Sequence, residues 1–129
     1  MKKIFKISLI IFVLFFVFST VFLFFLSRGL DEGMELSINN VDLLSLEDGL
    51  YRGSYDGGRW GNKIEVEVID NQIVQLNLVR DFRFSRQWVI DELFDNVIKS
   101  QSLDVDVVSE ATVSSKAYLK AIENALSQY

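Results

Sequence analysis

The sequence contains neither cysteine nor histidine, and these two absences exclude large classes of chemistry. Without cysteine there can be no disulfide, thiolate metal site, lipid-modified N-terminal cysteine or covalently held c-type haem. Without histidine, a Ser-His-Asp triad and a conventional zinc site are excluded as well. Most hydrolytic and metal-dependent enzymes are therefore out of reach, and we predict neither a catalytic nor a metal-binding residue.

Acidic residues outnumber basic residues after the first quarter of the chain. Residues 1–28 contain four Lys and Arg and no acid, whereas residues 29–129 contain nine Lys and Arg against 18 Asp and Glu, a net charge of −9. Binding to nucleic acid requires clustered positive charge that displaces counterions. We therefore expect no nucleic-acid partner.

An uncharged apolar run extends from Ile7 to Leu26, after lysines at positions 2, 3 and 6. A helix needs about 20 such residues to cross a hydrocarbon core of roughly 30 Å. The lysines place the N-terminus in the cytoplasm, so the rest of the chain is expected outside the cell membrane. The alternative, a cleaved signal peptide, has an apolar core of about 7–15 residues and an A-x-A pattern that residues 24–29 lack. We expect residues 1–28 to be an uncleaved transmembrane signal anchor.

Residues 29–47 mix polar and apolar side chains and are expected to form a linker that could hold a short helix or strand. After the turn signal Asp48-Gly49, apolar residues recur with a period of two, which predicts antiparallel strands. The expected strands are 50–55, 64–68 and 74–78, and the last two form a hairpin at Asp70-Asn71.

The apolar period changes to about 3.6 after Ser85, a candidate N-cap, and predicts an amphipathic helix. A short strand is expected at 103–107, and a last helix from about Val113 to Leu126. We therefore predict an α+β domain over residues 48–129, with helices packed on one face of a small antiparallel sheet, preceded by one transmembrane helix. The residues expected to be buried by the last helix are Val113, Ala117, Tyr118, Ala121, Ile122, Ala125 and Leu126.

Two features of the first half of the domain could contact a ligand, and each has a structural alternative. The glycine-rich loop Gly57–Gly61 could let its backbone approach a phosphate, or it could simply be a turn. The aromatic residues Tyr51, Tyr55 and Trp60 could stack on a planar ligand, although aromatic residues on strands more often belong to the core.

Polar residues before the last helix offer two further candidates. Asp104 and Asp106 would project from one face of a strand and could bind a divalent cation, but solvated carboxylates are the more common case. A cluster of hydroxyls also lies at the start of the helix, where free amide groups favour a phosphate. The more conservative interpretation is that these hydroxyls cap the helix. They belong to Ser109, Thr112, Ser114 and Ser115.

The segment Gln101–Leu126, with Asp106-Val107-Val108-Ser109-Glu110-Ala111-Thr112 within it, resembles the end of the FMN-binding domain family. This family includes the peripheral flavin subunits of the sodium-pumping NADH:quinone oxidoreductase and of the Rnf electron-transport complex. The segment from Asp48-Gly49-Leu50-Tyr51-Arg52-Gly53-Ser54 through Asp70-Asn71-Gln72-Ile73 matches too, so the resemblance covers about residues 48–127.

In many members of that family, a flavin transferase joins FMN by a phosphodiester to the threonine of an Asp-x-x-Ser/Thr-Gly-Ala-Thr motif. By this resemblance Asp106 begins the motif, Ser109 supplies its hydroxyl, Ala111 is its alanine, and Thr112 is the acceptor. Glu110 stands where the motif has glycine. A glutamate there adds negative charge beside a phosphate and lacks the conformational freedom of glycine, so partial modification is expected.

The resemblance implies a membrane-anchored extracytoplasmic flavoprotein that transfers electrons through FMN, which accepts one or two electrons. Such a protein is an electron carrier and the substrate of a flavin transferase rather than an enzyme with its own turnover. Its redox partner is left open. The alternative is a flavin-free interaction or structural module of the same fold within a membrane complex.

Overall fold

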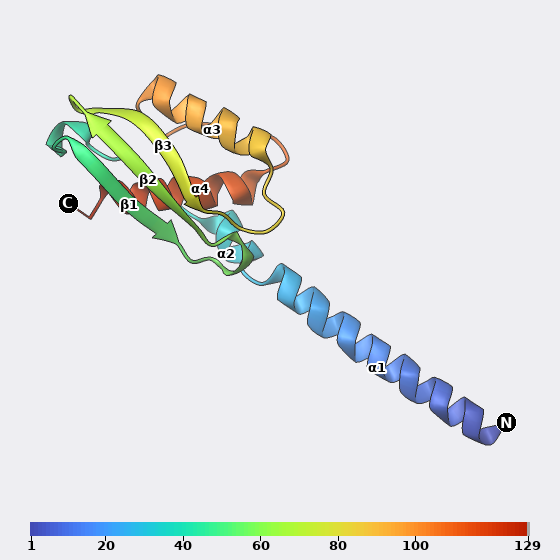
Figure 1. Cartoon of the computed structure of the whole chain (residues 1–129). Coiled ribbons are helices and arrows are strands. Elements are labelled where there is room, and N and C mark those ends of the chain that lie inside the picture. The colour runs from blue at the N-terminus through green and yellow to red at the C-terminus, as the bar shows by residue number, and fades with distance from the viewer. Residues whose placement is uncertain (129) are drawn as a thin grey trace.

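The structure, a computed structural model, describes residues 1–128, and its most prominent feature is a single helix that projects from an α+β domain (Figure 1). This helix, α1 (Lys2–Ser27), has no buried residue along its length. By its length and composition, it is able to cross a membrane. The apolar helix expected at the N-terminus is therefore present.

Three strands form one antiparallel sheet within residues 1–128, in the order β1 (Gly49–Tyr55), β2 (Asn62–Ile69) and β3 (Gln72–Arg80). The alternation in β2 buries one face completely, because Ile64, Val66 and Val68 are all 0% exposed. Asp70 and Asn71, at the turn between β2 and β3, have φ of 52° and 61°. Two successive positive φ angles suit the twist of a two-residue hairpin, and the predicted hairpin is confirmed.

Two helices, α3 (Gln87–Ser100) and α4 (Thr112–Leu126), cover one face of this sheet (Figure 1). Helix α4 packs across β1 and β2, while α3 packs against β3 and α4. The predicted α+β class is confirmed, as is the burial of the seven α4 residues expected from their spacing: Val113, Ala117, Tyr118, Ala121, Ile122, Ala125 and Leu126.

Two local predictions are wrong. Residues 103–107 form no strand, because side-chain oxygens already satisfy backbone donors of this segment. The Leu103 amide donates to Asn40 Oδ1 at 3.1 Å, and the Asp104 amide donates to Ser102 Oγ at 3.0 Å. Ser85 is not the N-cap of α3, which begins one residue later than expected, with Arg86 at the N-cap position.

The chain between α1 and β1 lies along the domain. It contains a short helix, α2 (Leu30–Glu35), that packs on α4, and a 3-10 turn, η1 (Leu43–Ser45). A Cβ atom at Gly33 would come within 2.5 Å of Val113 Cγ1, so the close approach of α2 to α4 requires glycine. Leu46 is only 5% exposed and belongs to the same core as the sheet and α4.

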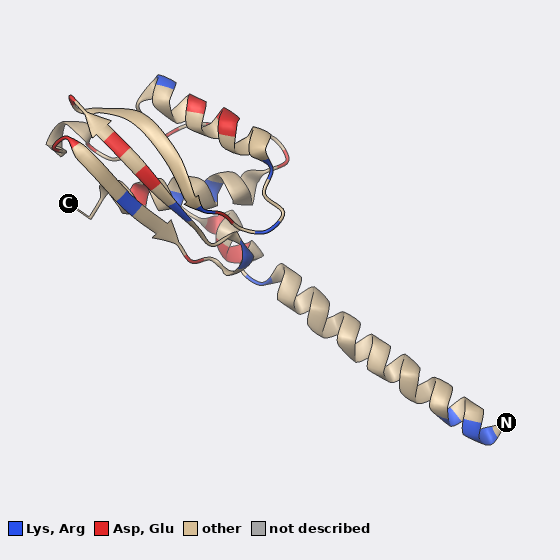
Figure 2. Cartoon of the chain, viewed as in Figure 1, with Lys and Arg blue, Asp and Glu red and all other residues tan. Residues whose placement is uncertain are grey.

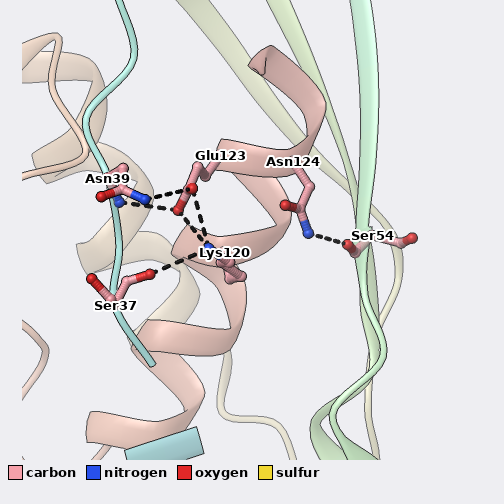
Figure 3. Close-up of polar contacts among 6 residues, drawn as sticks. All are labelled: Ser37, Asn39, Ser54, Lys120, Glu123 and Asn124. Atoms are coloured by element: carbon pink, nitrogen blue, oxygen red, sulfur yellow. Dashed lines mark hydrogen bonds and ion pairs between the residues drawn. The ribbon is translucent and has the colours of Figure 1, made fainter. Parts of the chain in front are cut away.

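A polar network fastens this segment to α4 (Figure 3). The Asn39 backbone amide donates to Glu123 Oε2 at 3.1 Å, and Asn39 Nδ2 donates to Oε1 at 3.3 Å. Lys120 Nζ donates to both Glu123 oxygens at 3.1 Å and to the Ser37 carbonyl at 3.3 Å. On the other side of α4, Asn124 donates to the carbonyl of Ser54 in β1 at 2.9 Å. Together these bonds hold α4 between residues 37–39 and β1.

Replacing Glu123 by alanine should lower the free energy of unfolding by about 1.5–3 kcal/mol, the usual range for hydrogen bonds to a charged group. The loss is expected because Asn39 and Lys120 would both lose their acceptor on a side chain that is nearly buried. Glu92→Ala, an exposed acid on α3, is the matched control and should stay within about 0.5 kcal/mol of the parent. Urea unfolding of the full chain in detergent measures both, and equal midpoints for the two variants would contradict the network's role.

Candidate functional site

A pocket opens where three segments meet: the N-terminus of α4, the 3-10 turn η2 (Gly58–Trp60) and the loop between β3 and α3. It has a volume of about 240 Å³, and its walls are mostly aromatic and basic. A neighbouring hollow of about 400 Å³ extends to Thr112 and Met34. It shares five lining residues with the pocket: Arg59, Trp60, Glu110, Ala111 and Ser114. Pocket and hollow thus adjoin each other around the start of α4.

The aromatic wall of the pocket is built on Tyr118 of α4. Phe82 stacks on the Tyr118 ring with centroids 5.1 Å apart, and Phe94 meets the same ring edge-on at 6.1 Å. The Tyr118 hydroxyl donates to Asp81 Oδ1 at 2.8 Å. Burial, followed by this bond to Asp81, raises the pKa of Tyr118 well above its ordinary value. The hydroxyl therefore stays protonated and continues to donate, which holds the β3–α3 loop against α4.

The basic wall consists of Arg59, Arg83 and Arg86. Within residues 1–128, no carboxylate lies within ion-pair distance of any of these three guanidinium groups, whereas Arg52 and Arg80 are paired with Glu65 and Asp56. The Arg59 guanidinium instead lies over the Trp60 ring, 4.4 Å from its centroid. Arginines without a carboxylate partner beside a cavity favour an anionic ligand, because guanidinium donors match phosphate and carboxylate oxygens.

The predicted motif residues lie at the start of α4, but they do not all reach the pocket. Ala111 is buried and lines both the pocket and the hollow, while half-buried Thr112 opens α4 and lines the hollow. Ser109 is exposed and lines neither. Asp106 is also exposed and lies with Lys99 at a separate shallow surface.

The capping interpretation of the hydroxyl cluster does not hold. The N-cap position of α4 is occupied by Ala111, which makes no side-chain cap hydrogen bond. Ser115 points back instead, and its hydroxyl accepts from the Val108 amide at 3.1 Å. Among the described residues, no side chain therefore caps the first turn of α4.

Of the three aromatic residues that could stack on a ligand, only Trp60 lines the pocket. All three nevertheless belong to the core, because Tyr51 and Tyr55 are each 8% exposed and Trp60 is 6% exposed. Sequence reasoning missed Arg83, Arg86 and Phe82 altogether. The available signal was the alternation of arginine and phenylalanine over residues 82–86, which lies within an otherwise acidic domain.

Glu110 occupies a left-handed backbone conformation, with φ of 63°. This is the position where the resembling motif has glycine, the residue that adopts positive φ most readily. A side chain with a Cβ costs roughly 1–2 kcal/mol in this conformation.

Glu110→Gly is accordingly expected to raise the free energy of unfolding by about 1 kcal/mol, because glycine adopts positive φ without steric cost. Glu92→Gly, in the exposed interior of α3, should instead lower it by about 1 kcal/mol. Chemical unfolding of the full chain measures both variants. If Glu110→Gly lowered the free energy of unfolding as Glu92→Gly does, the backbone at residue 110 would not be strained.

A pocket lined by unpaired arginines, at the N-terminus of a helix in an α+β domain, suits a negatively charged ligand. The sequence profile of the FMN-binding domain family matches residues 31–127, and the chain belongs to this family. Its cofactor is FMN. Two features of the site match that molecule: half-buried Phe82 offers aromatic surface to a ring, and Arg59, which lines both cavities beside the N-terminus of α4, suits a phosphate.

The chain is also similar to an uncharacterized protein of Treponema pallidum (strain Nichols). The two are 32% identical over 85 residues, which is 64% of this chain and 24% of that protein. The chain thus spans about a quarter of the length of this curated relative.

Proposed function

We propose that the protein is a membrane-anchored, extracytoplasmic electron-transfer flavoprotein whose FMN is joined to Thr112 by a phosphodiester. The observation that carries the proposal is the position of Thr112, at the first turn of α4 and on the wall of the hollow that adjoins the pocket. Its neighbour Ala111 lines both cavities and completes the Ala-Thr end of the family motif. Asp106 and Ser109 are assigned to the site by the motif alone.

The chain's own residues would hold FMN in two ways. Arg59 and the amide groups of the first turn of α4 supply positive charge on the phosphate side. Half-buried Phe82, held by stacking on Tyr118, would supply aromatic surface on the ring side. The bound flavin would supply the redox chemistry, since it exchanges one or two electrons. Glu110 lines both cavities and adds a negative charge that weakens the hold on a phosphate.

Co-expression of the full chain with a flavin transferase, in the presence of FAD and magnesium, tests the attachment. Intact mass measured under denaturing conditions should rise by one FMN less water, in part of the wild-type population and in more of the Glu110→Gly population. Flavin that co-purifies but is lost on denaturation would show non-covalent binding. Absence of flavin from both proteins would overturn the proposal and favour the flavin-free interaction module, for which Glu110 is the supporting observation.

The outward location of the domain is a separate part of the proposal, supported by the lysines that precede α1. Protease added to right-side-out vesicles should digest the domain while a tag fused before Met1 stays intact. Permeabilised vesicles, in which both ends are cleaved, are the control. A domain that survives in sealed vesicles would reverse the topology.

A further inference from the structure

The joint between α1 and the domain is short and closely packed. Only Arg28 and Gly29 separate α1 from α2. A Cβ at Gly29 would come within 2.9 Å of the Gly57 carbonyl oxygen, and one at Gly58 would come within 2.7 Å of the Arg28 carbonyl oxygen. Gly29 and Gly58 also have φ of 85° and 59°, which glycine alone adopts readily. Backbone contact at this joint restricts how far the domain can move away from the end of α1.

The loop between β3 and α3 lies at the end of the domain from which α1 leaves (Figure 1). Residues 82–88 contain no acid, and Figure 2 shows basic residues in this loop and at the exit of α1. Phe84 in this loop is 85% exposed and has φ of 64°, and Trp88, in the first turn of α3, is 48% exposed. The loop and the start of α3 thus present two exposed aromatic side chains beside Arg83 and Arg86, a combination suited to the headgroup layer of a bilayer.

We propose that the β3–α3 loop docks on the phospholipid interface of the membrane that α1 crosses, with Phe84 inserted among the headgroups and Arg83 and Arg86 bound to lipid phosphates. We assign the loop to the membrane because α1 lies next to it. Helix α1 ends only two residues before α2, and it leaves the domain on the same side as the loop (Figure 1). Acidic residues of α2, Asp31 and Glu32, are exposed on this side too, so contact occurs through the loop and not through the whole end of the domain.

Docking would also place the pocket against the membrane surface, because Arg83, Phe84 and Arg86 line it as well as forming the loop. The inference rests on the membrane anchoring proposed above. It assigns Arg83 and Arg86 to lipid phosphates and leaves Arg59 and the N-terminus of α4 for the phosphate of FMN.

The absence of cysteine allows single-cysteine labelling of the full chain. Phe84→Cys and Leu44→Cys, each carrying a polarity-sensitive fluorophore, would be placed in nanodiscs of phosphatidylcholine and phosphatidylglycerol, without flavin transferase. Leu44 is 80% exposed, and its segment lies at the end of the domain far from α1 (Figure 1). The label at residue 84 should emit at shorter wavelength and be quenched by lipids with headgroup-level nitroxides. The label at residue 44 should do neither.

A third variant, Phe15→Cys, separates the two proposals, because residue 15 lies within α1. Quenching at 15 by acyl-chain nitroxides but not at 84 would overturn the docking and leave the anchor standing. No quenching at 15 would overturn the anchor, and the docking with it. A blue shift at 84 without lipid quenching would show that protein covers the loop, which also overturns the docking. Arg83→Gln combined with Arg86→Gln should reduce the quenching at 84 severalfold.

Discussion

Gly53→Ala, which adds one methyl group to β1, is expected to lower the free energy of unfolding strongly. A Cβ at Gly53 would come within 2.2 Å of the Ala121 carbonyl oxygen and of the Ala125 amide nitrogen. Both are backbone atoms of α4, so no side chain can rotate away to make room. Helix α4 would have to move off the sheet. Overpacked cores lose about 1–3 kcal/mol when side chains can adjust, and we expect a loss of at least about 3 kcal/mol here.

Gly49→Ala is the matched control, because Gly49 lies in the same strand and no atom lies within 4 Å of its added Cβ. This variant should stay within about 0.5 kcal/mol of the parent. Urea unfolding of the full chain in detergent, followed by circular dichroism, measures both. Similar midpoints for the two alanine variants would show that α4 does not cross β1 as closely as the structure has it.

The main elements could be predicted because each repeats its pattern over many residues. Apolar side chains recur every second residue in β2 and at helical spacing in α3 and α4, and in each case the predicted face is the buried one. Residues 103–107 also alternate, yet they form no strand. A period of two shows which side chains face inward, but it does not show whether a neighbouring strand is free to pair. Here Asn40 occupies the Leu103 amide.

Long-range contacts account for most of what the sequence did not reveal. Asn39 meets Glu123 across 84 positions of sequence, so the attachment of residues 37–39 to α4 leaves no local pattern. The basic wall of the pocket has the same origin. Arg59 comes from η2 and Arg83 from the β3–α3 loop, and their lack of a carboxylate partner is visible only when the charges are placed in space. The motif at Thr112 was found because it is contiguous.

Thr112→Ala should abolish the covalent attachment of FMN to the co-expressed chain. The phosphodiester requires a hydroxyl oxygen, and Thr112 presents one from the first turn of α4 on the wall of the hollow. Ser114 offers the control: its hydroxyl is two residues away and lines both the pocket and the hollow. If position and motif together select the acceptor, Ser114→Ala should keep the added mass, and Thr112→Ser should keep at least part of it.

Thr112→Ala tests the attachment site only if the variant still folds, and we expect that it does. Thr112 is half-buried at the end of a helix, and the core side chains of α4 are all elsewhere, so the alanine variant should unfold within about 1 kcal/mol of the parent. Intact mass under denaturing conditions, measured beside urea unfolding, distinguishes the two effects. A mass gain retained by a folded Thr112→Ala protein would move the acceptor to another hydroxyl, and Ser109 would be tested next. A gain lost in Thr112→Ala and kept in Ser114→Ala would assign the phosphodiester to Thr112, because both variants remove one hydroxyl from the same hollow.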